Sequence, residues 1–166
     1  MRACALYQLH DDPETTVKTL SEAIAQYLRT GAQGGFFAIF YAVLAEAHRM
    51  LGSLREARAT LKQARSNTRP HWWDAELDRT EGGLLLAEGR PASDAEQSYQ
   101  NALQTARRQH AKLWELRAAR DLARLWRDQG KRAEARELLA SVYGWFTEGF
   151  ETVDLKDAKA LLAELA

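Results

Sequence analysis

Residues 114–150, WELRAARDLARLWRDQGKRAEARELLASVYGWFTEGF, decide the fold of this chain. Apolar residues recur at helical spacing on both sides of Gly130, which predicts a helix, a tight glycine turn and a second helix. Weaker copies of this helix–turn–helix unit occur upstream, around Gly89, Gly52 and Asp11. A unit that recurs along the chain is the sequence signature of a helical repeat protein.

The second helix of each unit carries a small residue and then apolar residues at matching distances from the turn, shifted by one position after Gly89, where the turn is longer. A small residue also stands seven positions before each turn glycine, at Ala45, Gly82 and Ala123, where it lets two helices approach closely. Glycine ends the first helix because a left-handed residue without Cβ causes no clash, and the short turn makes each pair antiparallel. The four sets of packing positions are Thr16, Leu20 and Ala23; Ala57, Leu61 and Ala64; Ala95, Tyr99 and Ala102; and Ala135, Leu139 and Val142.

These repeats predict an all-α fold of about eight or nine helices in one domain spanning residues 1–166. The units cover approximately residues 1–34, 35–70, 71–111 and 112–150, and the array looks truncated because residues 1–9 supply only a short first helix. A capping helix is expected at residues 154–165, with Asp154 as its N-cap. Its apolar face consists of Leu155, Ala158, Leu161, Leu162 and Leu165.

Composition narrows the function classes. The 23 basic and 23 acidic residues give a net charge of zero, which argues against nucleic-acid binding driven by bulk charge. No apolar run approaches the roughly 20 residues of a membrane span, and the N-terminus lacks the pattern of a signal peptide. The single cysteine, Cys4, forms no internal disulfide and fits a reducing cytoplasm.

No catalytic or metal-binding motif is visible in the chain. The four histidines, His10, His48, His71 and His110, are far apart, whereas a metal site needs several converging ligands. His48 falls on a packing position of the repeat. There is no Gly-x-Ser-x-Gly elbow and no phosphate-binding Gly-x-x-x-x-Gly-Lys-Ser/Thr loop, so we expect no enzyme activity and no cofactor.

The repeat pattern resembles the tetratricopeptide repeat, although the turns here are 37 to 41 residues apart rather than about 34. Residues 114–165, which continue beyond the opening stretch as ETVDLKDAKALLAEL, are similar to the C-terminal repeat region of bacterial signalling proteins. Those proteins combine a class III adenylate or guanylate cyclase domain with an ATPase. The resemblance implies a right-handed superhelix of antiparallel helix pairs and a non-enzymatic interaction module. It implies no catalytic residue.

An arginine row is the most suggestive feature for binding. Arg117, Arg120, Arg124 and Arg127 span only about 80° of one helix, in a segment (107–136) with ten basic and four acidic residues. By the same offsets Arg49 and Arg79 face the same groove, with Glu46 and Glu76 beside them. Such a row could clamp an acidic segment or a chain terminus. The alternative is a solvated face held by the pairs Arg117–Asp121 and Arg124–Asp128.

Aromatic residues form the second outlier. Trp72 and Trp73 are adjacent, and Tyr143, Trp145, Phe146 and Phe150 cluster near the last turn. Such residues usually pack between repeats, but an exposed Trp72–Trp73 pair would mark an interface. We therefore expect a cytoplasmic scaffold that binds a protein or peptide partner. The alternatives are a domain for intramolecular packing or self-association into a homo-oligomer, and a small-ligand sensor.

Overall fold

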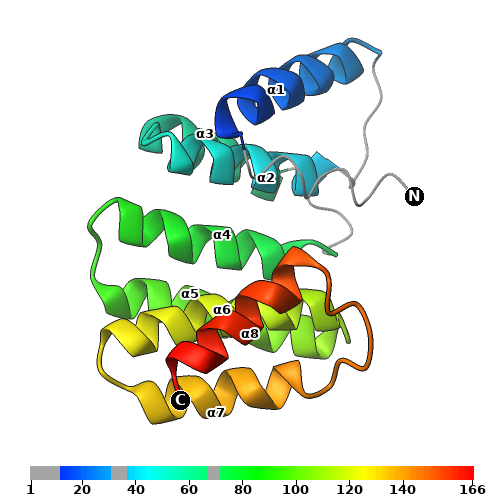
Figure 1. Cartoon of the computed structure of the whole chain (residues 1–166). Helices are drawn as coiled ribbons and strands as arrows, with labels where there is room; N and C mark the ends of the chain where they lie inside the picture. The colour runs from blue at the N-terminus through cyan, green and yellow to red at the C-terminus, as the bar shows by residue number, and fades with distance from the viewer. Residues whose placement is uncertain (1–11, 31–36, 67–71) are drawn as a thin grey trace.

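The computed structural model describes residues 12–30, 37–66 and 72–166, and every regular element in these ranges is a helix (Figure 1). The all-α prediction is therefore confirmed for the described residues. Short loops connect the helices within each pair. The elements are α1 (Pro13–Arg29), α2 (Phe37–Met50), α3 (Leu54–Ser66), α4 (Asp74–Ala87), α5 (Ala92–Arg108), α6 (Lys112–Asp128), α7 (Arg132–Tyr143) and α8 (Val153–Glu164).

The three turn glycines adopt the backbone conformation that the repeat predicts. Gly52, Gly89 and Gly130 have φ angles of +73°, +70° and +81°. At each turn the amide after the glycine donates to a carbonyl five residues earlier in the helix, as Ser53 does to His48. The end of α5 has the same pattern without a glycine, because His110 itself takes a φ of +54°. Four helices thus end in one way.

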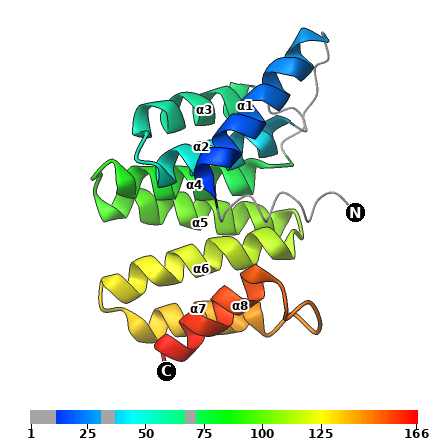
Figure 2. The ribbon, with the colours of Figure 1, turned by 45° about the horizontal axis from the view of Figure 1, so that its top comes forward.

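Consecutive helices pack against each other and reverse direction at these turns (Figure 1). The first helices of the pairs form a row in which α2 contacts α4, α4 contacts α6, and α6 contacts α8. Helix α8 also packs on α7, and Figure 2 shows the pairs stacked from α1 to α7. The row brings residues about 40 positions apart in sequence onto one face.

The core follows the predicted packing positions, with one exception. Thr16, Leu20 and all nine positions predicted in α3, α5 and α7 are buried, but Ala23 is exposed. Ile24 is buried instead, so the buried residues of α1 follow one another at intervals of four. The buried side chains form two clusters, one over α1–α4 and one over α5–α8.

Helix α8 has the predicted apolar face, but its start differs from the prediction. Leu155, Ala158, Leu161 and Leu165 are buried, as expected. The N-cap residue is Thr152, so the assignment of Asp154 as the N-cap was wrong. Asp154 lies inside the first turn, where it is 4% exposed and faces a guanidinium on α6 instead of the α8 backbone.

Some expectations concern residues outside the described ranges. The short helix predicted at residues 1–9, the degenerate turn at Asp11, and Cys4, His10 and His71 belong to this group. No helix in the described part of the chain is both long and apolar enough to cross a membrane.

Candidate binding site

Two glutamate–arginine pairs lie on the face that α2, α4 and α6 share, which we name the first-helix face. On α2, both carboxylate oxygens of Glu46 accept from Arg49, at 2.7 and 2.9 Å. On α4, both oxygens of Glu76 accept from Arg79, at 2.7 and 3.0 Å. The expectation that these glutamates stand beside these arginines is confirmed. A bidentate pair of this kind holds the guanidinium in a fixed plane.

Near the starts of α4 and α6 the charged groups are buried and bonded between helices. Arg79 also donates to Asp121 on α6 at 2.6 Å. Arg117 donates to both oxygens of Asp154 on α8, at 3.1 and 3.2 Å, and to Glu76 at 3.5 Å. We call these four residues (Glu76, Arg79, Arg117, Asp154) the closed end, because each side chain is at most 10% exposed.

Asp121 connects this network to the next turn of α6. It accepts from Arg79 through Oδ2, and from Arg120 and Arg124 through Oδ1 at 3.1 and 3.5 Å. Burial alone would raise the pKa of Asp121, but the guanidiniums of Arg120 and Arg79 outweigh it and lower the pKa to about 2. Asp121 is therefore ionised at neutral pH.

Helix α8 supplies carboxylates to the rest of the arginine row. Arg120 donates to Asp154 and Asp157 at 3.4 Å each, and Arg127 donates to Glu164 at 2.6 Å. Arg124 bonds Asp121 rather than the predicted Asp128, and its Nη2 lies 3.8 Å from Asp157. The carboxylates that the row meets thus belong to helix α8 of the same chain.

A cavity opens where the helices approach their turns. Six positions before Gly52, Gly89 and Gly130 stand Glu46, Gly83 and Arg124, so the middle helix has no side chain where both neighbours have a long one. The cavity has a volume of about 450 Å³. We call Glu46, Arg49, Gly83 and Arg124 the open end. The lining residues are Glu46, Arg49, Arg79, Gly83, Leu86, Ala87, Tyr99, Arg120, Asp121, Arg124, Leu125 and Asp128.

Tyr99 reaches this cavity from α5, which packs against both α4 and α6. A Cβ atom at Gly82 would lie 2.5 Å from the Tyr99 ring, so only glycine lets the ring pass α4. A Cβ at Gly83 would meet the Tyr99 hydroxyl at 3.7 Å and Arg49 Nε at 3.5 Å, which is ordinary contact. Burial raises the pKa of Tyr99, so the hydroxyl keeps its proton at neutral pH.

The structure divides the six predicted arginines into two groups. Arg49, Arg79, Arg120 and Arg124 line the cavity, whereas Arg117 is buried at the closed end and Arg127 lies against Asp128 and Glu164. Tyr99 was predicted only as a packing residue, and its place at the cavity was missed. The signal was the Gly82–Gly83 pair inside a helix, since consecutive glycines there indicate close approach of another group.

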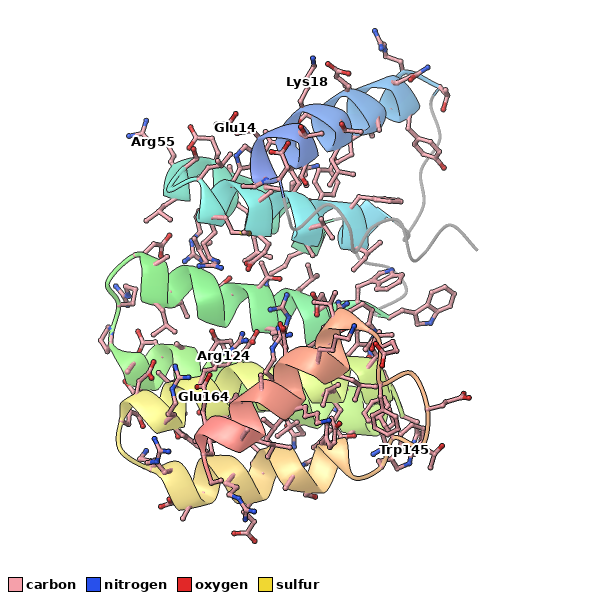
Figure 3. All side chains as sticks on the ribbon, in the orientation of Figure 1. Glu14, Lys18, Arg55, Arg124, Trp145 and Glu164 are labelled. Carbon is pink, nitrogen blue, oxygen red and sulfur yellow. The ribbon has the colours of Figure 1, made fainter. Side chains whose placement is uncertain are left out.

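The predicted Trp72–Trp73 pair separates in the structure. Trp72 is 58% exposed, whereas Trp73 is partly buried and packs edge-on against Trp114, with ring centroids 5.7 Å apart. In the later cluster Trp145 is 57% exposed, against the expectation of a core position, and lies edge-on to Phe146. Figure 3 shows Arg124 on the left and Trp145 on the right, toward opposite ends of the helices.

Within the described residues, no group of three or more histidine, cysteine or acidic side chains could hold a metal ion. His48 is partly buried, and burial lowers its pKa. Comparisons with protein-family models, with curated proteins and with solved structures found no match to this chain.

Proposed function

We propose that this chain is a non-enzymatic protein-interaction module, folded as a tetratricopeptide-like right-handed superhelix of antiparallel helix pairs. In this arrangement the first-helix face is the concave surface, α8 is the capping helix, and the groove binds a segment of a partner protein. The cavity at the open end carries the proposal, because a volume of about 450 Å³ lies in the range of ligand-binding pockets.

The charges around the cavity indicate the chemistry of the partner. Arg124 is 42% exposed and its Nε and Nη2 make no hydrogen bond with any described residue. Guanidinium groups with unused donors favour carboxylates, which accept two hydrogen bonds at once. An acidic segment or a free chain terminus therefore suits the open end. The arginines of the closed end already have carboxylate partners and take no part in this binding.

The likeness of residues 114–165 to the repeat region of bacterial cyclase–ATPase proteins supports a setting for the module. In this setting the chain is part of a cytoplasmic signalling or regulatory protein, and occupancy of the groove is passed on to an output domain. The packing motifs that carry the likeness are buried. They therefore support the assignment of the fold, whereas the choice of partner depends on the exposed residues.

Intramolecular packing is the second candidate, because the carboxylates of α8 already occupy much of the arginine row. Asp154, Asp157 and Glu164 reach Arg117, Arg120 and Arg127. In this function the row holds the end of the superhelix together, and exposed Trp72 serves self-association or contact with a neighbouring domain.

Fluorescence polarisation with labelled acidic and free-C-terminal peptides tests the proposal. Arg124→Gln should weaken binding by at least about tenfold, as expected for loss of a charge-assisted hydrogen bond. Arg136→Gln is the matched control, since Arg136 is exposed on α7 and does not line the cavity. Equal affinity in both variants, or no saturable binding by any peptide, would refute a groove partner.

Light scattering over a range of concentrations tests the second candidate. Self-association through Trp72 predicts a mass that rises with concentration and falls to the monomer in Trp72→Ser. A constant monomer mass in both proteins, together with peptide binding, favours the interaction module over self-association.

A further inference from the structure

The hydroxyl of Tyr99 lies at the cavity without a partner. Tyr99 is 4% exposed, and no described residue forms a hydrogen bond with its hydroxyl. The hydroxyl therefore has its donor and acceptor positions available to a group that enters the cavity. Because the ring passes α4 at Gly82, the hydroxyl is held against the wall that Gly83 leaves open.

Around this hydroxyl the oxygens of Glu46 and Asp121 are already engaged, whereas Arg49 and Arg124 keep N–H groups that make no hydrogen bond. Both oxygens of Glu46 accept from Arg49, and both oxygens of Asp121 accept from arginines. Arg49 keeps Nη1 without a hydrogen bond to a described residue, and Arg124 keeps Nε and Nη2. Beside Tyr99 the unused groups are therefore mainly donors, which favours a ligand that brings acceptors.

The formal charges of the residues that line the cavity sum to a positive value. Four arginines and three carboxylates line it, which leaves 4 − 3 = +1. Arg79 and Arg120 also bond carboxylates outside the lining, so the guanidinium donors left for a ligand belong to Arg49 and Arg124. The remaining wall is apolar and consists of Leu86, Ala87 and Leu125, of which Leu86 is 39% exposed. Contact with a ligand would cover this exposed side chain.

We propose that this cavity binds one carboxylate joined to an apolar group, with the Tyr99 hydroxyl and Arg124 donating to the carboxylate and the Leu86 wall covering the apolar group. The carboxylate belongs either to a small free acid or to the last residue of a partner chain. The inference rests on the proposed function only in taking the first-helix face as a binding surface. The inference adds to that function the chemical class of the ligand and a residue, Tyr99, that recognises the carboxylate.

Titration calorimetry with two pairs of probes tests this site. N-acetyl-leucine and N-acetyl-leucinamide differ only in the carboxylate, and a hexapeptide ending in leucine is used with a free and with an amidated terminus. Only the acids should bind. Binding of the small acid alone identifies a free metabolite as the source, and binding of the peptide alone identifies a chain terminus. Either result supports the site.

Tyr99→Phe separates a ligand contact from a structural role. It removes a hydroxyl that forms no bond within the described fold, so the Tm should not change, while acid binding should weaken at least about tenfold. Tyr143→Phe makes the same chemical change outside the cavity and should leave binding intact. Gly83→Leu fills the cavity and should abolish binding.

Three results would overturn the inference: equal binding of acid and amide, equal binding by wild type and Tyr99→Phe, or no binding of any of the four probes. The same measurements distinguish failure of the Tyr99 site from failure of the proposed function. If longer peptides bind, lose affinity in Arg124→Gln and keep it in Tyr99→Phe, the groove stands and the Tyr99 site falls. If only N-acetyl-leucine binds, in a Tyr99-dependent way, the site stands and a protein partner is excluded.

Discussion

The closed and open ends of the first-helix face contain the same local motif in two environments. On both α2 and α4, a glutamate holds an arginine three residues later through two hydrogen bonds. Arg79 is 10% exposed and also bonds Asp121 on the next helix. Arg49 is 30% exposed and has no bonded carboxylate on another described helix. The motif alone therefore does not decide between a structural and a binding role.

The difference lies in what the neighbouring helix presents. α6 places Asp121 against Arg79, whereas α4 places Gly83 near Arg49. A buried guanidinium needs a partner that compensates for its lost hydration, and a carboxylate supplies that. A glycine leaves space and unused donors. One end of the face thus stabilises the stack, and the other end is left with a cavity.

Arg79→Met should give the largest effect on stability. It leaves Glu76 with only the 3.5 Å contact of Arg117 and removes the shortest bond to Asp121, and we expect the free energy of unfolding to fall by about 3 kcal/mol. Arg49→Met, the matched variant at the open end, should cost less than about 1 kcal/mol. Urea unfolding of both variants at neutral pH measures the contrast. Equal losses would show that the two ends do not differ.

Replacing each of the two adjacent glycines of α4 with alanine should change the stability of the protein in opposite directions. Gly82→Ala forces the Tyr99 ring to move and should destabilise the protein by about 1–3 kcal/mol. Gly83→Ala meets only ordinary contacts and should stabilise the protein by up to about 1 kcal/mol, because alanine favours helix. Thermal unfolding compares the two variants with wild type. A stabilising Gly82→Ala would contradict the close approach of Tyr99.

Asp121, which bonds both Arg79 and Arg124, should make stability depend on pH. Its pKa of about 2 lies below the ordinary value of 3.8 for an aspartate, so it contributes about 2 kcal/mol that is present above pH 3.8 and is lost as the pH falls through about 2. Unfolding free energies measured from about pH 5 to pH 2 should fall less steeply in Asp121→Asn. Identical slopes in the two proteins would count against this role.

Arg124→Gln should have the smallest effect on stability. Its side chain is 42% exposed and its contacts with Asp121 and Asp157 are long, at 3.5 and 3.8 Å, so solvent weakens them. We expect a change below about 0.5 kcal/mol in urea unfolding. A loss as large as that of Arg79→Met would place Arg124 in the stabilising network and remove it from the binding site.

Part of the candidate site could be predicted from the sequence. Helical periodicity predicted that the arginines and their neighbouring glutamates share one face, and in the structure Arg49, Arg79, Arg120 and Arg124 line one cavity. The exposure of each arginine could not be predicted in this way. It depends on carboxylates 34 to 42 positions away in the chain, which repeat offsets alone do not match to a given arginine.

The sequence by itself determined the helices, their turns and their buried faces, because these depend on spacing within about ten residues and on the freedom of glycine at positive φ. Only the tertiary structure decided which charged side chains have partners within the protein and which keep donors for a ligand. Asp154 became a partner of Arg117 instead of a helix cap, and Tyr99 reached the cavity past Gly82. Both outcomes depend on how separate helices meet, since burial and the presence of a partner are properties of the packed molecule.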